Sequence, residues 1–189
     1  MGQKTNPVGL RLGIVRGWSS VWFARGGRYA EYIREDARLR KYLLKNKKLE
    51  KAQISRVEIE RKPQEVQVTI WTARAGLVIG ARGGTIDLLT KELKHFTGKS
   101  VKMKVEEIRQ PERDASLVAD SIARQIESRV SVRRAMKRAI SDAIRAGAEG
   151  VKVSCAGRLG GAEMKRRNTY HEGRVPLHTL RADVDFARA

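Results

Sequence analysis

Residues 76–86 carry the string GLVIGARGGTI, in which an apolar run leads to one glycine and a second glycine follows after two residues. Gly80 and Gly83 leave the backbone without side chains on both sides of Ala81 and Arg82. Backbone amides and a helix N-terminus can then approach a phosphate closely. The string is therefore a candidate RNA-binding loop, although a plain turn between two helices would also use glycine here.

Two nucleotide-binding motifs are excluded for this loop. A P-loop needs Gly-Lys followed by Ser or Thr at the helix start, whereas Gly83-Gly84-Thr85 has no lysine. A dinucleotide-binding fingerprint needs GxGxxG after a strand, and this stretch has neither. We therefore expect no nucleotide cofactor, and the sequence suggests no other cofactor and no metal site.

The segments around the loop predict a regular order of elements. Apolar residues at helical spacing predict a helix over 29–48, and alternating patterns predict two strands around a turn at 62–64. A short apolar helix precedes the loop, and an amphipathic helix follows it until Gly98. The expected segments are a helix at 29–48, strands at 54–60 and 65–71, a helix at 85–96 and a strand at 101–108. This order and the loop resemble the type II KH fold, whose three strands form a mixed sheet with helices on one face.

The second half of the chain predicts a separate small domain. Pro111, with Glu112 and Asp114, is typical of a helix start, and Gly147 ends a second helix over 131–146. The buried stripe expected for the first helix comprises Val118, Ile122, Ile126 and Val130. Alternation at 151–157 and again at Ala182, Val184 and Phe186 predicts strands, with hairpin-like turns between them.

The predicted fold class is thus α+β, a type II KH domain followed by a small α/β domain of two helices packed on a small sheet. The predicted boundaries are an extended basic N-terminal arm at 1–16, the KH domain at 17–108, a linker at 109–111 and the second domain at 112–189.

The charge of the chain indicates its partner. Forty Lys and Arg face 21 Asp and Glu, which gives a formal net charge of +19 and a pI near 10.7. Repulsion among so many positive charges destabilises a compact monomer, so we expect a polyanion to neutralise them. No apolar run approaches the ~18 residues of a membrane span, and the N-terminus lacks a signal-peptide core. Nucleic acid is the leading partner class, and we expect no membrane association.

One cysteine, Cys155, excludes a disulfide within the chain and fits a reducing cytosol. Val151, Val153 and Cys155 share one face of a predicted strand. We expect Cys155 to be a small buried apolar residue rather than a reactive thiol.

The densest basic feature is SVRRAMKRAISDAIR at 131–145. On a helical wheel its apolar residues form one side, whereas Arg134, Lys137 and Arg138 lie opposite, with Arg133 at the margin. Like charges at these spacings repel, so we favour an RNA-facing surface. The alternative is an ordinary solvated helix face.

Two further basic segments are candidate sites for RNA. Lys165, Arg166, Arg167 and Arg174 surround Tyr170 and His171 in a predicted hairpin turn, which would serve equally as an exposed polar turn. The N-terminal arm contributes Lys4, Arg11 and Arg16, and a basic arm of this kind typically orders on nucleic acid.

Five strings extend the resemblance over essentially the whole chain. They are MGQKTNPVGLRLG, VIGARGG, RRAMKRAI, AGRLGGAEMKR and YHEGRVPLHTLRADVDF, in this order. Together they resemble bacterial small-subunit ribosomal protein number three, a family of KH-containing proteins of the ribosomal head. Members of this family commonly continue into a charged C-terminal tail, whereas this sequence stops at Ala189, so we expect any function of that tail either to be absent or to have been lost with it.

The resemblance implies a structural, non-enzymatic protein of the cytoplasmic ribosome that is not a homo-oligomer. It implies binding to ribosomal RNA of the head and contact with small-subunit proteins ten and fourteen. With proteins four and five, the family lines the channel where messenger RNA enters the subunit. The residues that the family ties to unwinding of the messenger match Arg133, Arg134 and Lys137.

Two other functions stay open from the residues. A free KH protein that regulates single-stranded RNA would use the same loop at Gly80–Gly83. An enzyme such as a nuclease would have to use the His171–Glu172 pair, which has no second carboxylate spaced for a metal. We expect the chain not to be an enzyme.

Overall fold

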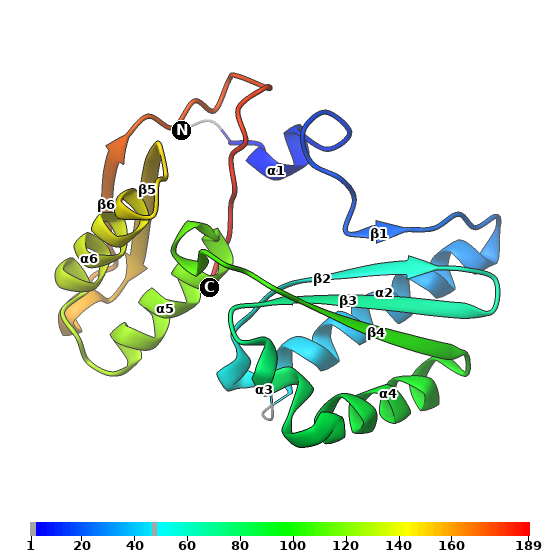
Figure 1. The fold of residues 1–189 in the computed structure, drawn as a ribbon. Helices are drawn as coiled ribbons and strands as arrows, with labels where there is room; N and C mark the ends of the chain where they lie inside the picture. Colours follow the sequence, from blue (N-terminus) through cyan, green and yellow to red (C-terminus); the bar gives the residue numbers. More distant parts are fainter. Residues whose placement is uncertain (1–2, 47–48) are drawn as a thin grey trace. The chain divides into compact units, whose positions relative to one another are not determined.

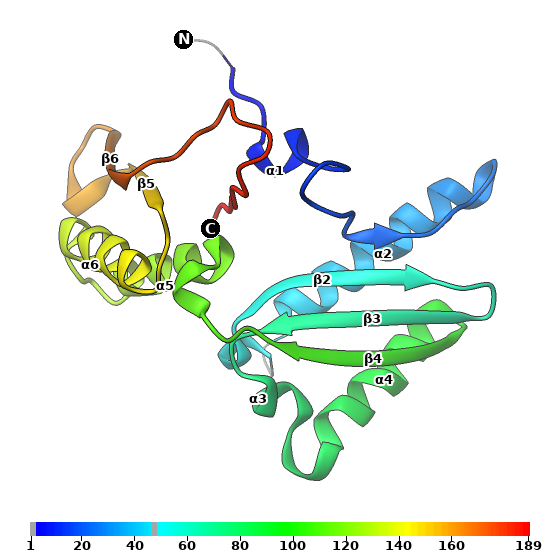
Figure 2. The same cartoon turned by 45° about the horizontal axis from the view of Figure 1, so that its top comes forward.

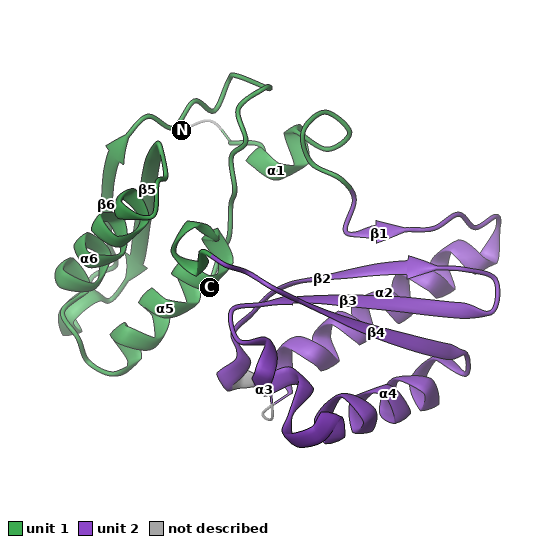
Figure 3. Ribbon diagram, in the orientation of Figure 1, with its two compact units in different colours: residues 1–17, 110–189 green, residues 18–109 purple. Residues whose placement is uncertain are grey.

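A computed structural model describes residues 3–46 and 49–189 of the chain. The chain forms two compact units (Figure 3). Residues 18–109 form one unit, and residues 110–189 form the other together with the N-terminal segment up to Gly17.

The unit of residues 18–109 is built on a four-stranded sheet in the order β1-β2-β3-β4 (Figure 1). Its strands are β1 (Ser20–Val21), β2 (Ile54–Arg61), β3 (Glu65–Thr72) and β4 (Ser100–Glu107). β2 and β3 are antiparallel, whereas β3 with β4 and β1 with β2 run parallel. The predicted mixed sheet of three strands is confirmed, and β1 adds a short edge strand that the sequence pattern did not reveal.

Helices cover one face of this sheet (Figures 1 and 2). The helical elements are α2 (Gly27–Lys45), η1 (Glu50–Ala52), α3 (Ala75–Ile79), η2 (Ala81–Gly83) and α4 (Gly84–Thr97). Alternate residues of β3, namely Val66, Val68 and Ile70, are fully buried, and Leu43 of α2 and Leu93 of α4 are fully buried in the same core. The predicted helix at 29–48 corresponds to α2, and its last two predicted residues lie outside the described residues.

A buried carboxylate ties three segments of this unit together. The side chains of Asp36 in α2 and Arg61 in β2 are each only 3% exposed and form an ion pair. Asp36 also accepts hydrogen bonds from Ser20 Oγ and Trp22 Nε1, both at 2.8 Å. Arg61 Nη1 donates to Glu35 at 2.6 Å. Because a buried charge needs partners, these bonds fix β1 and the residues after it against α2.

In the other unit, one helix packs against a two-stranded sheet and a second helix packs against the first. Its elements are α1 (Pro7–Leu10), η3 (Pro111–Arg113), α5 (Ala115–Glu127), α6 (Val132–Arg145), β5 (Gly150–Gly157), η4 (Leu159–Gly161) and β6 (Arg166–Gly173). β5 and β6 are antiparallel, and α6 packs against both strands and against α5. Met136, Ile140 and Ala143 on the inner face of α6 are buried, as the helical wheel predicted.

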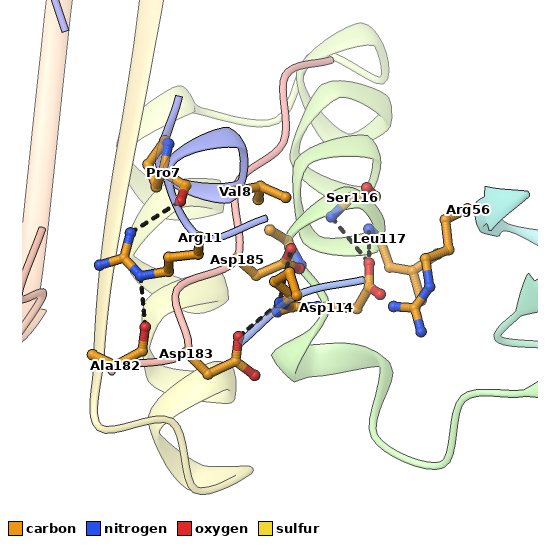
Figure 4. A network of polar contacts seen from close by, with 12 residues as sticks. Pro7, Val8, Arg11, Arg56, Asp114, Ser116, Leu117, Ala182, Asp183 and Asp185 are labelled. Carbon is orange, nitrogen blue, oxygen red and sulfur yellow. Dashed lines mark hydrogen bonds and ion pairs between the residues drawn. The ribbon is translucent and has the colours of Figure 1, made fainter. Parts of the chain in front are cut away.

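The start of α5 differs in detail from the prediction. Pro111 begins a short 3-10 turn rather than the helix itself. Asp114 is the N-cap, and its carboxylate accepts hydrogen bonds from the amides of Ser116 and Leu117 at 3.0 and 3.1 Å (Figure 4). Along the helix, Ile122 is buried as predicted, whereas the other three residues of the predicted stripe are only half-buried, and Leu117, which was not predicted, is buried.

The N-terminal segment is held by the guanidinium of Arg11, which is completely buried. Its Nε donates to the Ala182 carbonyl at 2.6 Å and its Nη1 to the Pro7 carbonyl at 3.0 Å (Figure 4). Its Nη2 donates to three further carbonyls, those of Pro176, Leu177 and Thr179. Arg16 adds an ion pair to Asp183 at 2.7 Å.

These contacts correct two predictions. The described part of the predicted extended arm is instead folded, with α1 capped by Asn6, and it is bonded to the C-terminal segment. The strand expected around Ala182, Val184 and Phe186 does not form, since residues 174–189 contain no strand. Arg11 and Arg16 of the N-terminal segment bond to backbone carbonyls and carboxylates of the C-terminal segment. Such pairing between distant segments leaves no periodic signature in the sequence.

We predict that Asp36→Asn lowers the free energy of unfolding of the 18–109 unit by about 3 kcal/mol, because it leaves Arg61 buried with an incomplete partner. Urea unfolding followed by tryptophan fluorescence measures this, because Trp18, Trp22 and Trp71 all lie in this unit. Glu58→Gln is the control, since Glu58 pairs with Arg56 in an exposed ion pair and should cost less than ~1 kcal/mol. Equal stability of the two variants would contradict the assigned role of Asp36.

We predict that Arg11→Lys loosens the C-terminal segment, because one ammonium cannot satisfy five separate carbonyls and buried carbonyls lose their partners. Trypsin should cleave after Arg181 at least ~10 times faster than in the wild type, since a tenfold rate change corresponds to only ~1.4 kcal/mol in the opening equilibrium. Mass spectrometry of the released residues 182–189 follows the reaction. Arg16→Gln, which removes a partly exposed ion pair, should change the rate much less. Cleavage of Arg11→Lys at the wild-type rate would show that the carbonyl cluster does not hold this segment.

Candidate nucleic-acid interface

The glycine loop of residues 80–83 connects α3 to α4 through a conformation that requires glycine. Gly80 has φ 74° and ψ −179°, a region of backbone space that side chains essentially exclude. A Cβ at this position would lie 2.1 Å from the Oγ1 of Thr85, at the start of α4. Gly80 therefore lets the end of α3 press directly against the first turn of α4.

The tip of the loop is open to solvent. Ala81 and Arg82 are exposed, and Arg82 takes the left-handed conformation with φ 53°. No side chain caps the first amides of α4, all of whose residues are described. These amides, the positive end of the helix dipole and the Arg82 guanidinium are together suited to holding a phosphate.

The apolar residues that flank the loop differ in burial. Val78 is fully buried, and Leu89 anchors the following helix. Ile79 is 41% exposed beside the loop. Ile86 is half-buried. The loop thus offers apolar surface as well as amides, which suits contact with a nucleotide base next to its phosphate.

The outer face of α6 carries the densest positive charge in its unit. Arg133, Arg134, Lys137 and Arg138 are all exposed, opposite the buried apolar face. Arg138 lies 3.7 Å from Asp142 in the same helix. Within the described chain, the first three of these cations have no ion-pair partner. Three cations without a compensating carboxylate, held beside Arg138 on a rigid helix, provide a surface for phosphates.

The third basic feature lies only partly at a hairpin turn, since Lys165 ends the connection between β5 and β6, whereas two of its arginines lie on β6. Arg166 and Arg167 begin β6, opposite Gly157 and Ala156 of β5, and their side chains leave opposite faces of the sheet. The hairpin connection itself contains η4 and ends at Lys165. Arg174 follows the strand. All four residues are exposed, so each stays a candidate RNA contact.

The N-terminal candidates separate into two groups. Lys4 is exposed, and it takes no part in the hydrogen bonds and ion pairs given above for the N-terminal segment. Arg11 is buried among carbonyls, so the prediction that it contacts RNA is wrong for this structure. Arg16 is half-buried against Asp183 and Asp185 and is largely neutralised there.

The residues considered for catalysis are not brought together. His171 and Glu172 are neighbours on β6, so their side chains point to opposite faces. Among the residues that the structure describes, no group of three His, Cys, Asp or Glu side chains could hold a metal ion. Burial raises the pKa of the half-buried Cys155 thiol, which disfavours the reactive thiolate.

In the same described part of the chain, no helix is both long and apolar enough to cross a membrane.

One feature was missed by the sequence predictions. Five of the ten aromatic residues, namely Trp18, Trp22, Phe23, Tyr29 and Tyr32, lie within residues 18–32, and Arg25 and Arg28 lie between Phe23 and Tyr29. Phe23 is 80% exposed in the structure. The density of aromatic residues next to arginines was the signal available in the sequence.

Comparison with protein families agrees with this geometry. A family model described as "KH domain" matches residues 38–113, and one described as "Ribosomal protein S3, C-terminal domain" matches residues 122–189. The first match contains the glycine loop, and the second contains α6, β5 and β6. The fold and the loop together define a KH-type RNA-binding protein.

Curated relatives identify the family. The small ribosomal subunit protein uS3 of Desulfatibacillum aliphaticivorans is 57% identical over 98% of this chain and 84% of its own length. The proteins of the same name from Beijerinckia indica and Thermodesulfovibrio yellowstonii are 55% and 54% identical over the whole chain and over 78% and 86% of their own lengths. The chain belongs to the family of the small ribosomal subunit protein uS3, which confirms the resemblance found in the sequence.

We predict that Gly80→Ala destabilises the 18–109 unit by about 2 kcal/mol and weakens binding of single-stranded RNA, because a Cβ would strain the backbone and force Thr85 away. Gly84→Ala is the matched control, since Gly84 has ordinary helical angles and open space at its Cβ. It should be neutral or stabilise the unit by up to ~1 kcal/mol. Tryptophan-monitored urea unfolding and oligonucleotide titration measure both effects. Equal behaviour of the two variants would show that the loop conformation is not required.

Proposed function

We propose that this chain is a structural constituent of the small ribosomal subunit in the cytoplasm, where it binds ribosomal RNA of the head. It further lines the channel through which messenger RNA enters, with α6 facing the messenger. Its protein neighbours are small-subunit proteins ten and fourteen in the head and proteins four and five at the channel. Membership of the uS3 family supports the structural role, and the net charge of +19 supports an extensive RNA partner.

The observation that carries the messenger role is the outer face of α6. Arg133, Arg134 and Lys137 have no ion-pair partner among the described residues, so their charges are available to an incoming backbone. The face is rigid, because Met136 and Ile140 on the opposite side are buried. Guanidinium groups pair with phosphate and stack on bases. Because unpaired bases are free to stack, such a face can bind a single strand in preference to a duplex.

The proposed role involves no chemical step by this chain. The cations bind phosphates in turn as the messenger moves, and the translating ribosome supplies the energy of any unwinding. The glycine loop at Gly80–Gly83 provides a second contact, in which the amides of α4 hold about four nucleotides of backbone. The exposed residues Lys4, Lys165, Arg166, Arg167 and Arg174 contribute electrostatic contacts to ribosomal RNA.

We predict that replacing Arg133, Arg134 and Lys137 by Gln reduces the salt dependence of binding to a single-stranded messenger fragment. If each residue neutralises one phosphate, the slope of log K against log salt concentration should fall by about 2. Lys102→Gln with Lys104→Gln is the control, because both lysines already pair with glutamates. It should change the slope by well under 1. An unchanged slope in the triple variant would refute the messenger contact.

A loop variant separates this role from that of a free KH regulator. Ala81→Asp with Arg82→Asp places negative charge at the loop tip. If the chain is a ribosomal constituent, this variant should still sediment with small subunits at high salt, because the other basic surfaces remain. If it loses all RNA binding while the α6 triple variant retains it, the regulator function is favoured.

A further inference from the structure

The aromatic residues of the chain are concentrated in one short segment. The chain has three Trp, four Tyr and three Phe, and five of these ten residues fall within residues 18–32. Arg25 and Arg28 are interleaved with them. This segment includes β1 and the start of α2, which places it away from the glycine loop within the same unit.

The segment is held firmly by the buried carboxylate of Asp36. The indole N–H of Trp22 donates to Asp36 at 2.8 Å. The Trp22 ring also packs edge-on against Tyr29 and Tyr32, with ring centroids 5.6 and 5.4 Å apart. Phe23 follows directly in the chain, so its backbone is fixed by its neighbour. An aromatic residue whose backbone is fixed in advance loses less entropy when it binds a partner.

Phe23 itself is unusually open. It is 80% exposed, and the Arg25 guanidinium lies 5.7 Å from the ring centroid. Phe23, Ala24, Arg25, Arg28 and Tyr32 line a shallow hollow of about 450 Å³. The volume falls in the range of sites that hold small ligands, and a single nucleotide is of this size.

The charge of the hollow is entirely positive. Its lining contains two guanidinium groups and no carboxylate. On the Tyr32 ring, the Arg61 guanidinium lies at 4.7 Å and the Lys99 ammonium at 4.5 Å from the centroid. Lys99 thus adds a further cation next to the hollow, whereas Arg61 is neutralised by Asp36.

We propose that the aromatic–arginine platform, formed by Phe23, Arg25, Arg28 and Tyr32, binds one unpaired nucleotide of RNA. The base stacks on the open ring of Phe23, and the guanidinium of Arg28 pairs with the phosphate. Aromatic rings beside arginines are the usual means of holding unstacked bases, and stacking tolerates any base. The site is distinct from α6 and from the glycine loop, so it requires RNA binding by the chain but not the messenger role.

A protein partner is the competing occupant, because Trp18 and Val21 nearby are 65% and 59% exposed. The lining of the hollow favours RNA, since two guanidiniums that have no ion-pair partner in the described part of the chain, beside an open ring, match a phosphate and a base together. An apolar protein surface would leave both charges without a partner.

The test uses the full chain and a single-stranded oligonucleotide that contains one 2-aminopurine, whose fluorescence is quenched by stacking. Phe23→Leu keeps an apolar side chain but removes the aromatic face. We expect it to lose most of the quenching and to weaken binding about tenfold. Arg28→Gln should retain part of the quenching and reduce the salt slope by about 0.7. Unfolding midpoints from tryptophan fluorescence should match the wild type, because Phe23 is not in the core.

Phe96→Leu is the matched control. Phe96 is also exposed, at 59%, but it lies on α4 and packs against Tyr42 with ring centroids 5.1 Å apart. This variant should quench and bind as the wild type does. If Phe23→Leu and Phe96→Leu are indistinguishable in quenching and affinity, the platform does not bind RNA.

Crosslinking locates the nucleotide independently. A 4-thiouridine oligonucleotide should crosslink to the tryptic peptide of residues 17–25, which contains Trp18, Trp22 and Phe23. Crosslinks confined to 80–83 or 133–138 would overturn the proposal. So would a Phe23→Leu protein that binds RNA normally but no longer joins small subunits, because that result assigns the platform to a protein. The messenger role fails separately, through an unchanged salt slope in the α6 triple variant.

Discussion

The ion pair between Asp36 and Arg61 is the interaction on which the KH unit depends. A carboxylate out of contact with water is tolerated only if donors surround it, and here they come from β1, from Trp22 and from β2. The edge strand β1 is too short to hold its place by strand pairing alone. The position of the aromatic segment therefore follows from one buried charge.

The positive charge of the chain has two different uses. Arg11 and Arg61 are buried and act as structural cross-links, each surrounded by acceptors from distant segments. Arg133 and Arg134 lie on a solvent face where acceptors are missing among the described residues. The net charge of +19 counts all of these residues equally. Burial and hydrogen bonding distinguish them, so the charge that is available to RNA is smaller than the composition suggests.

Periodic patterns explain which parts could be predicted. The strands β2, β3 and β4 and the helices α2, α4 and α6 were predicted because one face of each is buried and recurs at a fixed spacing. The basic face of α6 followed from the same spacing. Arg11 could not be distinguished from a surface cation, because four of its five carbonyl partners are more than 160 residues away. Phe23 was missed because an exposed ring takes no part in the periodic spacing of buried residues.

The contact between Arg11 and the C-terminal segment has a consequence for synthesis. Ala182 follows Arg11 by 171 residues. At roughly 5–20 residues per second, its partner carbonyl is made on the order of ten seconds or more after Arg11. Residues 18–109 are complete well before then and are free to fold on the growing chain. The N-terminal segment, although it is made first, therefore remains without four of the five carbonyl partners of Arg11 until residues 176–182 have been made.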